Sequence, residues 1–95
     1  MIKKKAFIIG VTGQDGSYLS KFLIDKNYSV YGYTRSLKRK NLQNLLILNT
    51  YNNVKLRKYS EKNPSSIFED ILKLKPNEIY FFSGLSSVNN SFYNP

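Results

Sequence analysis

An apolar run followed by three evenly spaced glycines constrains this 95-residue chain more than any other feature. Residues Ala6–Gly10 form a continuous apolar run, which is typical of a strand buried on both faces of a sheet. Gly10, Gly13 and Gly16 then follow at three-residue intervals. From Asp15 to about Lys26 the apolar residues recur at helical spacing, and Asn27 after them can cap the helix end. The segment therefore predicts a buried strand, a glycine-rich turn and an amphipathic helix.

The alternation of strand and helix continues to the end of the chain. Further strands are predicted at Ser29–Thr34, Val54–Tyr59 and Asn77–Phe82. The apolar segment Leu42–Leu48 fits either a short helix or irregular turns. Such an alternation predicts right-handed βαβ units and a parallel sheet. The expected fold is α/β, with a parallel sheet of about four strands.

A further helix is expected between the third and fourth strands. Asn63 can cap its start and Pro64 suits its first turn, where a missing N–H costs nothing. Pro76 is expected to stop it. Its apolar residues predict one buried face with two more apolar side chains beside it: Ile67, Ile71 and Leu74, then Phe68 and Leu72.

The composition excludes several kinds of chemistry. The sequence has no Cys and no His, so disulfides, zinc sites and His-based catalysis are excluded from it, and a reducing cytoplasm is the expected location. The apolar run that begins at Ala6 breaks at Thr12, too early for a signal peptide or a membrane span. With a net charge of +9, a basic face of the protein could bind nucleic acid, a phosphorylated ligand or anionic lipid. The basic residues form no continuous stripe, so we predict neither a nucleic-acid nor a membrane partner.

The glycines allow two interpretations, a structural turn or a dinucleotide-binding loop. In the second, Gly10 permits a tight turn, Gly13 lets the backbone approach a diphosphate, and Gly16 lets helix and strand pack closely. The N–H groups at the helix start would face the anion. The spacing is G-x-x-G-x-x-G, unlike the G-x-G-x-x-G of many dehydrogenases, and no Gly-Lys-Ser/Thr follows as in a P-loop. The position after the first strand favours cofactor binding.

The end of the second predicted strand indicates which cofactor. An Asp or Glu there usually binds a free ribose 2′-hydroxyl. This chain has Thr34-Arg35-Ser36 and then Lys38-Arg39-Lys40, with no acidic residue. A guanidinium and nearby ammonium groups suit a 2′-phosphate, so NADP is favoured over NAD; a solvated basic loop is the alternative.

Beyond the glycines, the chain resembles the extended short-chain dehydrogenase/reductase family and, within it, the GDP-mannose 4,6-dehydratases. The residues that carry the resemblance are "GQDGSYL" at Gly13–Leu19, "KPNEIY" at Lys75–Tyr80, "SSV" at Ser86–Val88 and "SF" at Ser91-Phe92. The likeness spans nearly all 95 residues, which are about the first quarter to third of a typical member. It implies a Rossmann-like three-layer α/β fold of which only the first half, about four strands, is present. Residues 1–95 would then be the N-terminal part of an NADP-binding Rossmann domain, without the catalytic and sugar-binding parts.

The resemblance also implies a set of cofactor contacts. The diphosphate would be held by Gly10, Val11, Thr12, Gly13, Gln14 and Asp15, with Gly16 completing the loop. Arg35 and Ser36 would hold the adenosine 2′-phosphate, and Ser83, Gly84 and Ser86 would line the nicotinamide side. Two segments depart from the family pattern. Tyr59-Ser60-Glu61 replaces Gly-Asp-Leu after the third strand, and Leu85 replaces a Gln before the matched serine.

For the intact enzyme, the resemblance implies conversion of GDP-mannose to GDP-4-keto-6-deoxymannose and water, by a lyase that acts as a homo-oligomer. The catalytic Tyr-x-x-x-Lys pair of the family works from a helix. Tyr51 and Lys55 have this spacing, but they lie in a loop entering a strand, so no catalytic residue is assigned. The 95-residue chain alone is expected to be inactive. The alternatives are another nucleotide-sugar epimerase or dehydratase, and a truncated non-catalytic remnant.

Overall fold

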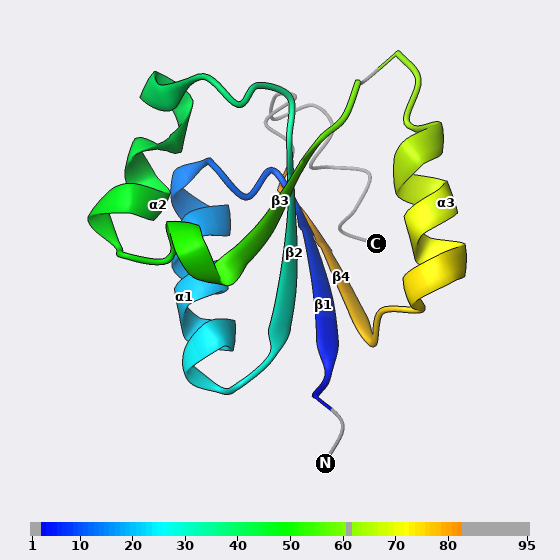
Figure 1. Ribbon diagram of the computed structural model, residues 1–95, viewed down its shortest axis with the longest axis horizontal. Coiled ribbons are helices and arrows are strands. Elements are labelled where there is room, and N and C mark those ends of the chain that lie inside the picture. The colour runs from blue at the N-terminus through cyan, green and yellow to red at the C-terminus, as the bar shows by residue number, and fades with distance from the viewer. Residues whose placement is uncertain (1–2, 61, 83–95) are drawn as a thin grey trace, which may run out of the picture.

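Four parallel strands form one sheet in the order β3-β2-β1-β4 in the computed structural model, which describes residues 3–60 and 62–82 (Figure 1). The strands are β1 (Lys5–Ile9), β2 (Ser29–Thr34), β3 (Val54–Lys58) and β4 (Glu78–Phe81). The α-helices are α1 (Gln14–Asp25), α2 (Gln43–Ile47) and α3 (Ser65–Leu74), and the short 3₁₀ turns are η1 (Arg39–Leu42) and η2 (Tyr51–Asn53). Helices α1 and α2 cover one face of the sheet and α3 covers the other (Figure 1). The expected α/β fold with a parallel sheet is confirmed.

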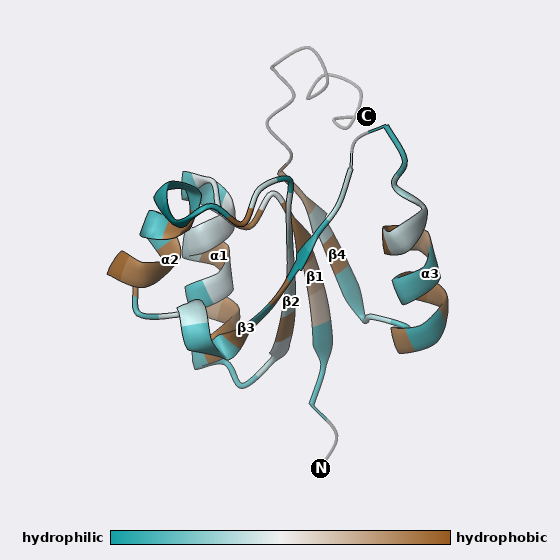
Figure 2. Ribbon diagram, turned by 45° about the horizontal axis from the view of Figure 1, so that its top comes forward, coloured by the Kyte–Doolittle hydropathy of each residue, from teal (hydrophilic) through white to brown (hydrophobic). Residues whose placement is uncertain are grey.

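The continuous apolar run of β1 is explained by its central place in the sheet. Strand β1 pairs with β2 on one side and with β4 on the other. Ala6 and Ile8 pack toward the face covered by α1, while Phe7 and Ile9 pack toward the face covered by α3, and none of the four is more than 1% exposed. Figure 2 shows brown, apolar residues in the strands, and brown also on the outer side of α2. A strand covered on both faces needs apolar residues at every position.

The face under α3 holds aromatic rings and a buried polar group. The ring of Phe7 lies 5.2 Å from that of Tyr33 and 5.5 Å from that of Tyr31, between ring centroids. The Tyr33 hydroxyl donates a 2.7 Å hydrogen bond to Asp70 on α3, and Arg57 Nε lies 3.5 Å from the same carboxylate oxygen. Burial and this hydrogen bond raise the pKa of Tyr33. The hydrogen bond ties α3 to the centre of the sheet.

The element ends differ slightly from the sequence prediction. Strand β1 ends at Ile9 because Gly10 has a φ of 94°, which no strand residue adopts. Strand β3 ends at Lys58, one residue before the predicted end, and β4 is one residue shorter than predicted at each end. Asn27 has a φ of 69° and donates its N–H to the Ile24 carbonyl at 2.8 Å. It therefore terminates α1 in the left-handed conformation, as a C-terminal cap does.

Helix α3 begins one residue later than the sequence predicts. The N-cap position is occupied by Pro64, whose carbonyl accepts the Ile67 N–H at 3.0 Å, and α3 begins at Ser65. Asn63 accepts the Ser65 N–H through Oδ1 at 3.4 Å, outside the helix proper. The helix ends at Leu74, because Lys75 has a φ of 50°, just before the predicted stop at Pro76.

The apolar residues of α3 divide as the helical spacing predicts. Ile67 is buried, and Ile71 and Leu74 are half-buried against the cluster under α3. The two apolar side chains beside this face are exposed, Phe68 at 61% and Leu72 at 76%. None of the helices in the described residues is both long and apolar enough to cross a membrane.

The ambiguous segment Leu42–Leu48 is helical. Turn η1 runs directly into α2, and Leu42 and Leu45 are buried, whereas Leu46 and Ile47 are exposed. The spacing of three between the two buried leucines fits one face of a helix. This face packs α2 beside α1 and leaves the polar residues of η1 and α2 at the carboxyl edge of the sheet (Figure 1).

Candidate nucleotide-binding site

The glycine-rich loop lies at the carboxyl end of β1 and is held to the neighbouring strand. The N–H groups of Gly10 and Val11 both donate to the Tyr33 carbonyl at the end of β2, at 2.8 and 3.3 Å. The Gly13 N–H donates to the Gly10 carbonyl at 3.2 Å, and the Ser17 N–H to the Gly13 carbonyl at 2.9 Å. These bonds fold the loop into a tight turn that leads straight into α1.

Two of the three glycines are required for the folded structure of the loop and of α1. Gly10 has a φ of 94°, a conformation that disfavours any side chain. A Cβ on Gly16 would lie 2.3 Å from the Gly10 carbonyl oxygen and 2.9 Å from the Val11 Cα. Both neighbours are backbone atoms, so Gly16 is needed for the close approach of α1 to the loop. The predicted turn and packing roles of Gly10 and Gly16 agree with this geometry.

Gly13 differs from the other two glycines. Its φ of −74° and ψ of 173° are open to any residue. A Cβ there would meet only the Gly10 carbonyl oxygen, at an ordinary contact distance of 3.6 Å. Neither the backbone conformation nor the packing of the described residues therefore explains why this exposed position has no side chain.

Gly13 is also the N-cap of α1, where it can offer no side-chain cap to the first N–H groups of the 12-residue helix. The start of such a helix carries a partial positive charge and N–H groups that lack intrahelical partners. An uncapped and exposed helix start of this kind can bind an anion closely.

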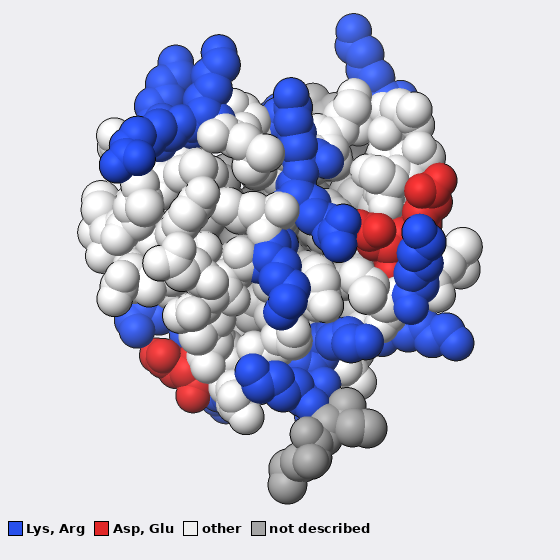
Figure 3. Space-filling model, viewed as in Figure 1, with Lys and Arg blue, Asp and Glu red and all other residues white. Residues whose placement is uncertain are grey.

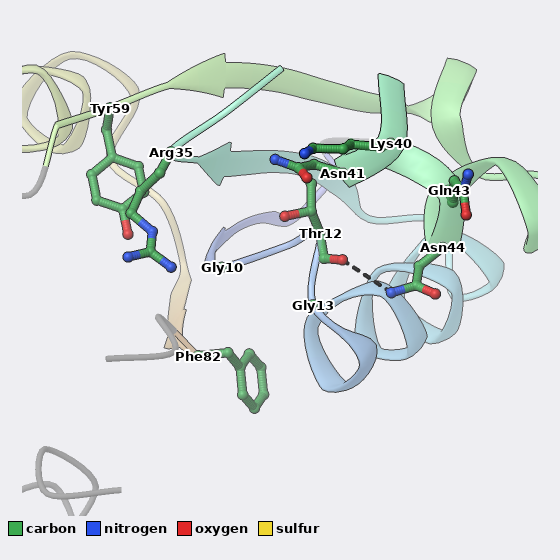
Figure 4. A pocket seen from close by; sticks show the side chains of 10 residues that line it. All are labelled: Gly10, Thr12, Gly13, Arg35, Lys40, Asn41, Gln43, Asn44, Tyr59 and Phe82. Atoms are coloured by element: carbon green, nitrogen blue, oxygen red, sulfur yellow. Dashed lines mark hydrogen bonds between the residues drawn. The ribbon is translucent and has the colours of Figure 1, made fainter. Parts of the chain in front are cut away.

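A cleft of about 470 Å³ lies in front of the helix start (Figure 4). Its walls come from the glycine loop, from the segments that follow β2 and β3, from η1 and α2, and from the end of β4. The lining residues are Gly10, Thr12, Gly13, Arg35, Lys40, Asn41, Gln43, Asn44, Tyr59 and Phe82. Ligands of open parallel sheets bind at this carboxyl edge, in the crevice where the chain crosses from one face of the sheet to the other.

Hydrogen bonds fix the walls of the cleft relative to one another. Thr12 Oγ1 lies 3.1 Å from Thr34 Oγ1, which joins the glycine loop to the end of β2. Thr34 Oγ1 also donates to the Ser36 carbonyl at 3.0 Å and so shapes the turn that presents Arg35. Asn44 Nδ2 donates to the Thr12 carbonyl at 3.1 Å, which attaches α2 to the loop (Figure 4). The cleft is thus built from hydrogen-bonded segments.

The charge around the cleft is positive. Arg35 and Lys40 line it, and none of its described lining residues is acidic. Lys38 and Arg39 are exposed at the start of η1. Figure 3 shows Lys and Arg side chains gathered at the upper left of the molecule, above α2 in Figure 1. Such a cleft favours a ligand with several negative charges.

The predicted site residues fall into three groups. Gly10, Thr12, Gly13 and Arg35 line the cleft. Others lie nearby without lining it: Val11, Gln14, Asp15, Gly16 and Ser36. Val11 has its side chain in the core. The remaining three, Ser83, Gly84 and Ser86, lie outside the described residues.

Several lining residues were missed by the sequence prediction. They are Asn41, Gln43, Asn44, Tyr59 and Phe82. Lys40, which also lines the cleft, was among the basic residues suggested for the 2′-phosphate. The polar residues between the buried Leu42 and Leu45 were the available signal, because a helix buried through its leucines turns such residues outward. Tyr51 lies on η2 and Lys55 on β3, so the two residues do not share a helix.

The sheet order, the glycine loop and the cleft at the carboxyl edge define a Rossmann-like α/β protein. The sequence pattern of the family described as GDP-mannose 4,6 dehydratase matches residues 7–95. The chain belongs to this family.

Individual relatives agree with the family assignment. The GDP-mannose 4,6-dehydratase of Vibrio cholerae is 39% identical over 99 residues, covering 99% of this chain and 27% of the relative. The GDP-mannose 4,6 dehydratase of Homo sapiens is 36% identical, covering 92% of this chain and 25% of the relative. The chain therefore spans about a quarter of the length of these curated relatives.

The fold is shared with solved structures of low sequence identity. The Bordetella bronchiseptica enzyme WbmH, solved in complex with NAD⁺, superimposes with a TM-score of 0.70 at 22% identity and covers 98% of this chain and 30% of that one. An epimerase homologue from Burkholderia cenocepacia superimposes with a TM-score of 0.65 at 15% identity, covering 94% of this chain and 28% of that one. These likenesses support the Rossmann-like fold.

Proposed function

We propose that residues 1–95 form the N-terminal, NADP-binding part of the Rossmann domain of a GDP-mannose 4,6-dehydratase. The observation that carries the proposal is Gly13. The packing of the described residues gives no reason for a glycine there, yet the absence of a side chain opens the start of α1 to the cleft. A diphosphate that must approach the backbone supplies the reason.

The proposed contacts are those that the family resemblance implies, and the cleft-lining positions of Gly10, Thr12, Gly13 and Arg35 support them. The backbone from Gly10 to Asp15 holds the diphosphate at the start of α1, with Gly16 as its structural support. Arg35, with Ser36, binds the adenosine 2′-phosphate at the end of β2. Charge-assisted hydrogen bonds between a guanidinium and the 2′-phosphate favour NADP, because NAD has a hydroxyl in place of that phosphate. Ser83, Gly84 and Ser86, outside the described residues, are proposed to line the nicotinamide side.

In the intact enzyme the substrate is proposed to be GDP-mannose. When bound, NADP would accept hydride from C4 of the mannose and return it after water is lost across C5 and C6, giving GDP-4-keto-6-deoxymannose. This chain's residues would bind and orient the cofactor. We also propose, from the family resemblance, that the intact enzyme is a cytoplasmic homo-oligomer.

Cofactor selectivity tests the proposal. Calorimetric titration of the purified chain should give a lower Kd for NADP than for NAD, and Arg35→Ala should remove this preference. A charge-assisted hydrogen bond contributes about 1.5–3 kcal/mol, which corresponds to roughly a 10- to 150-fold change in Kd.

Lys73→Ala is the matched control, because it removes one positive charge from α3, outside the cleft. It should leave both affinities unchanged. Equal affinity of the unaltered chain for the two dinucleotides would contradict the assignment of Arg35, and absence of binding to either would contradict the proposed function.

A further inference from the structure

A hydrogen bond from α2 to the glycine loop is left unexplained by the proposed contacts. Asn44 Nδ2 donates to the Thr12 carbonyl at 3.1 Å, although the two residues are 32 positions apart in the sequence. Both residues line the cleft, so the bond lies in its wall (Figure 4). Thr12 directly precedes Gly13, the N-cap of α1. The bond therefore acts on the backbone beside the proposed diphosphate position.

The peptide unit between Thr12 and Gly13 is held at both of its polar groups. Its carbonyl accepts the Asn44 N–H, and its own N–H donates to the Gly10 carbonyl at 3.2 Å. A rotation of this peptide unit would break both hydrogen bonds. Asn44 thus helps to fix the backbone directly before the first N–H groups of α1, which have no intrahelical partners.

The same hydrogen bond changes the charge that a ligand meets in the cleft. The Thr12 carbonyl oxygen carries a partial negative charge beside the partially positive start of α1. An unpaired carbonyl at this position would repel an anion, whereas an amide N–H that donates to the oxygen offsets its charge. The Asn44 amide therefore favours the approach of a diphosphate through the loop, without a contact of its own.

Asn44 is held in position by the burial of its neighbour in the helix. Leu45 is fully buried and belongs to the same core cluster as Val11, the residue before Thr12. Consecutive residues of α2 are thus placed against consecutive residues of the loop. The Leu48 N–H donates to the Asn44 carbonyl at 3.0 Å, which keeps Asn44 helical. Asn44 is itself exposed, so replacing its side chain should leave the core intact.

We propose that Asn44 is a positioning residue for the diphosphate of the cofactor, because its amide holds the Thr12–Gly13 peptide unit and offsets the charge of the Thr12 carbonyl. The inference rests on the proposed function, since it assumes that a dinucleotide binds at the start of α1. NADP and NAD share the diphosphate, so Asn44 contributes equally to both, whereas Arg35 distinguishes them at the 2′-phosphate.

The test is a calorimetric titration of the full 95-residue chain with NADP and with NAD, in the parent, in Asn44→Leu and in Asn44→Ala. Leucine keeps the approximate size of asparagine and alanine removes the side chain, and neither can donate the hydrogen bond. Both variants should raise the Kd of both dinucleotides by about three- to tenfold and leave the ratio of the two Kd values unchanged within about twofold.

Asn52→Leu is the matched control, because it makes the same change on η2, outside the cleft. It should leave both Kd values unchanged. Asn44 and Asn52 are both exposed, so all three variants should also keep the urea unfolding midpoint of the parent.

The outcomes separate a positioning role from a structural one and from failure of the proposed function. Parent-like affinity in Asn44→Leu and Asn44→Ala would overturn the inference and leave the proposed function standing. A changed ratio of the two Kd values would overturn it as well, because η1, which carries Lys40, would then have moved with α2. A lowered unfolding midpoint in both variants would assign the bond to folding instead. Binding of neither dinucleotide by the parent would overturn the proposed function, and this inference with it.

Discussion

Replacing each of two glycines in the same loop by alanine should separate folding from binding. In Gly16→Ala the new Cβ would lie 2.3 Å from the Gly10 carbonyl oxygen and 2.9 Å from the Val11 Cα. Real contacts at these distances do not occur, so α1 must shift away from the loop. Overpacking of this kind costs about 1–3 kcal/mol, and the better helix propensity of alanine returns up to about 1 kcal/mol.

The expected net loss is about 1–2 kcal/mol of the free energy of unfolding. With a urea m-value of about 2 kcal/mol/M, the unfolding midpoint should fall by about 0.5–1 M. Urea titration followed by far-ultraviolet circular dichroism measures this shift. The loss is a substantial part of the roughly 5–14 kcal/mol that a domain of this size has in total.

Gly13→Ala is the matched control, three residues earlier in the same loop. Its Cβ would meet the Gly10 carbonyl oxygen at 3.6 Å, and its φ of −74° suits alanine. Because alanine is less favourable than glycine at an N-cap by about 0.5–1 kcal/mol, the midpoint should fall by about 0.3–0.5 M, less than in Gly16→Ala. NADP affinity, by contrast, should fall at least tenfold. Equal destabilisation by the two substitutions, or full NADP affinity in Gly13→Ala, would refute the separate roles given to these glycines.

Two further predictions concern polar contacts outside the cleft. Tyr33→Phe removes the 2.7 Å hydrogen bond to Asp70 and should lower the free energy of unfolding by about 1.5–3 kcal/mol in urea titrations, whereas an unchanged midpoint would show that α3 does not depend on it. Glu78 accepts hydrogen bonds from Tyr80 at 2.7 Å and Tyr28 at 2.9 Å, and these lower its pKa. The stabilising contribution of the Glu78 carboxylate should therefore be complete above about pH 4.3, the pKa of a Glu side chain in an unfolded chain. It should be lost as the pH falls through the lower pKa that Glu78 has in the folded protein. Unfolding midpoints measured between pH 3 and 7 should decline less steeply in Glu78→Gln than in the parent, and parallel declines would contradict this assignment.

The strands and the first helix could be predicted because local patterns determine them. A continuous apolar run placed β1 correctly at the centre of the sheet, and Asn27 marked the end of α1. The errors concern the ends of elements, which depend on the backbone conformation of single residues. The strand prediction included Gly10, since only its φ of 94° removes it from β1. The start of α3 was displaced because sequence alone does not show whether Pro64 or Asn63 occupies the N-cap.

The sequence predicted the glycine loop and Arg35 of the candidate site but not the residues on its other walls. The glycine loop and Arg35 are local signals at the ends of strands, and the structure places them at one cleft. Tyr59 and Asn44 reach that cleft from segments distant in sequence, so only the pairing of β2 with β3 and the packing of α2 bring them there. The different requirements of Gly13 and Gly16 were also visible only once the neighbouring atoms had positions.

The central place of β1 has a consequence for the order in which the sheet assembles. Its partner β2 follows soon after it, but its other partner, β4, comes from the far end of the described chain, where Lys5 and Asn77 are joined by hydrogen bonds across 72 residues. This separation is about threefold longer, so closing that loop costs roughly 1 kcal/mol more in chain entropy. Strand β1 should therefore spend part of every folding event as an edge, with apolar side chains and an unpaired backbone beside it. During synthesis it leaves the ribosome before β2, β3 and β4 and can pair with β4 only after the other three strands have emerged. In this interval, pairing with another chain competes with native pairing.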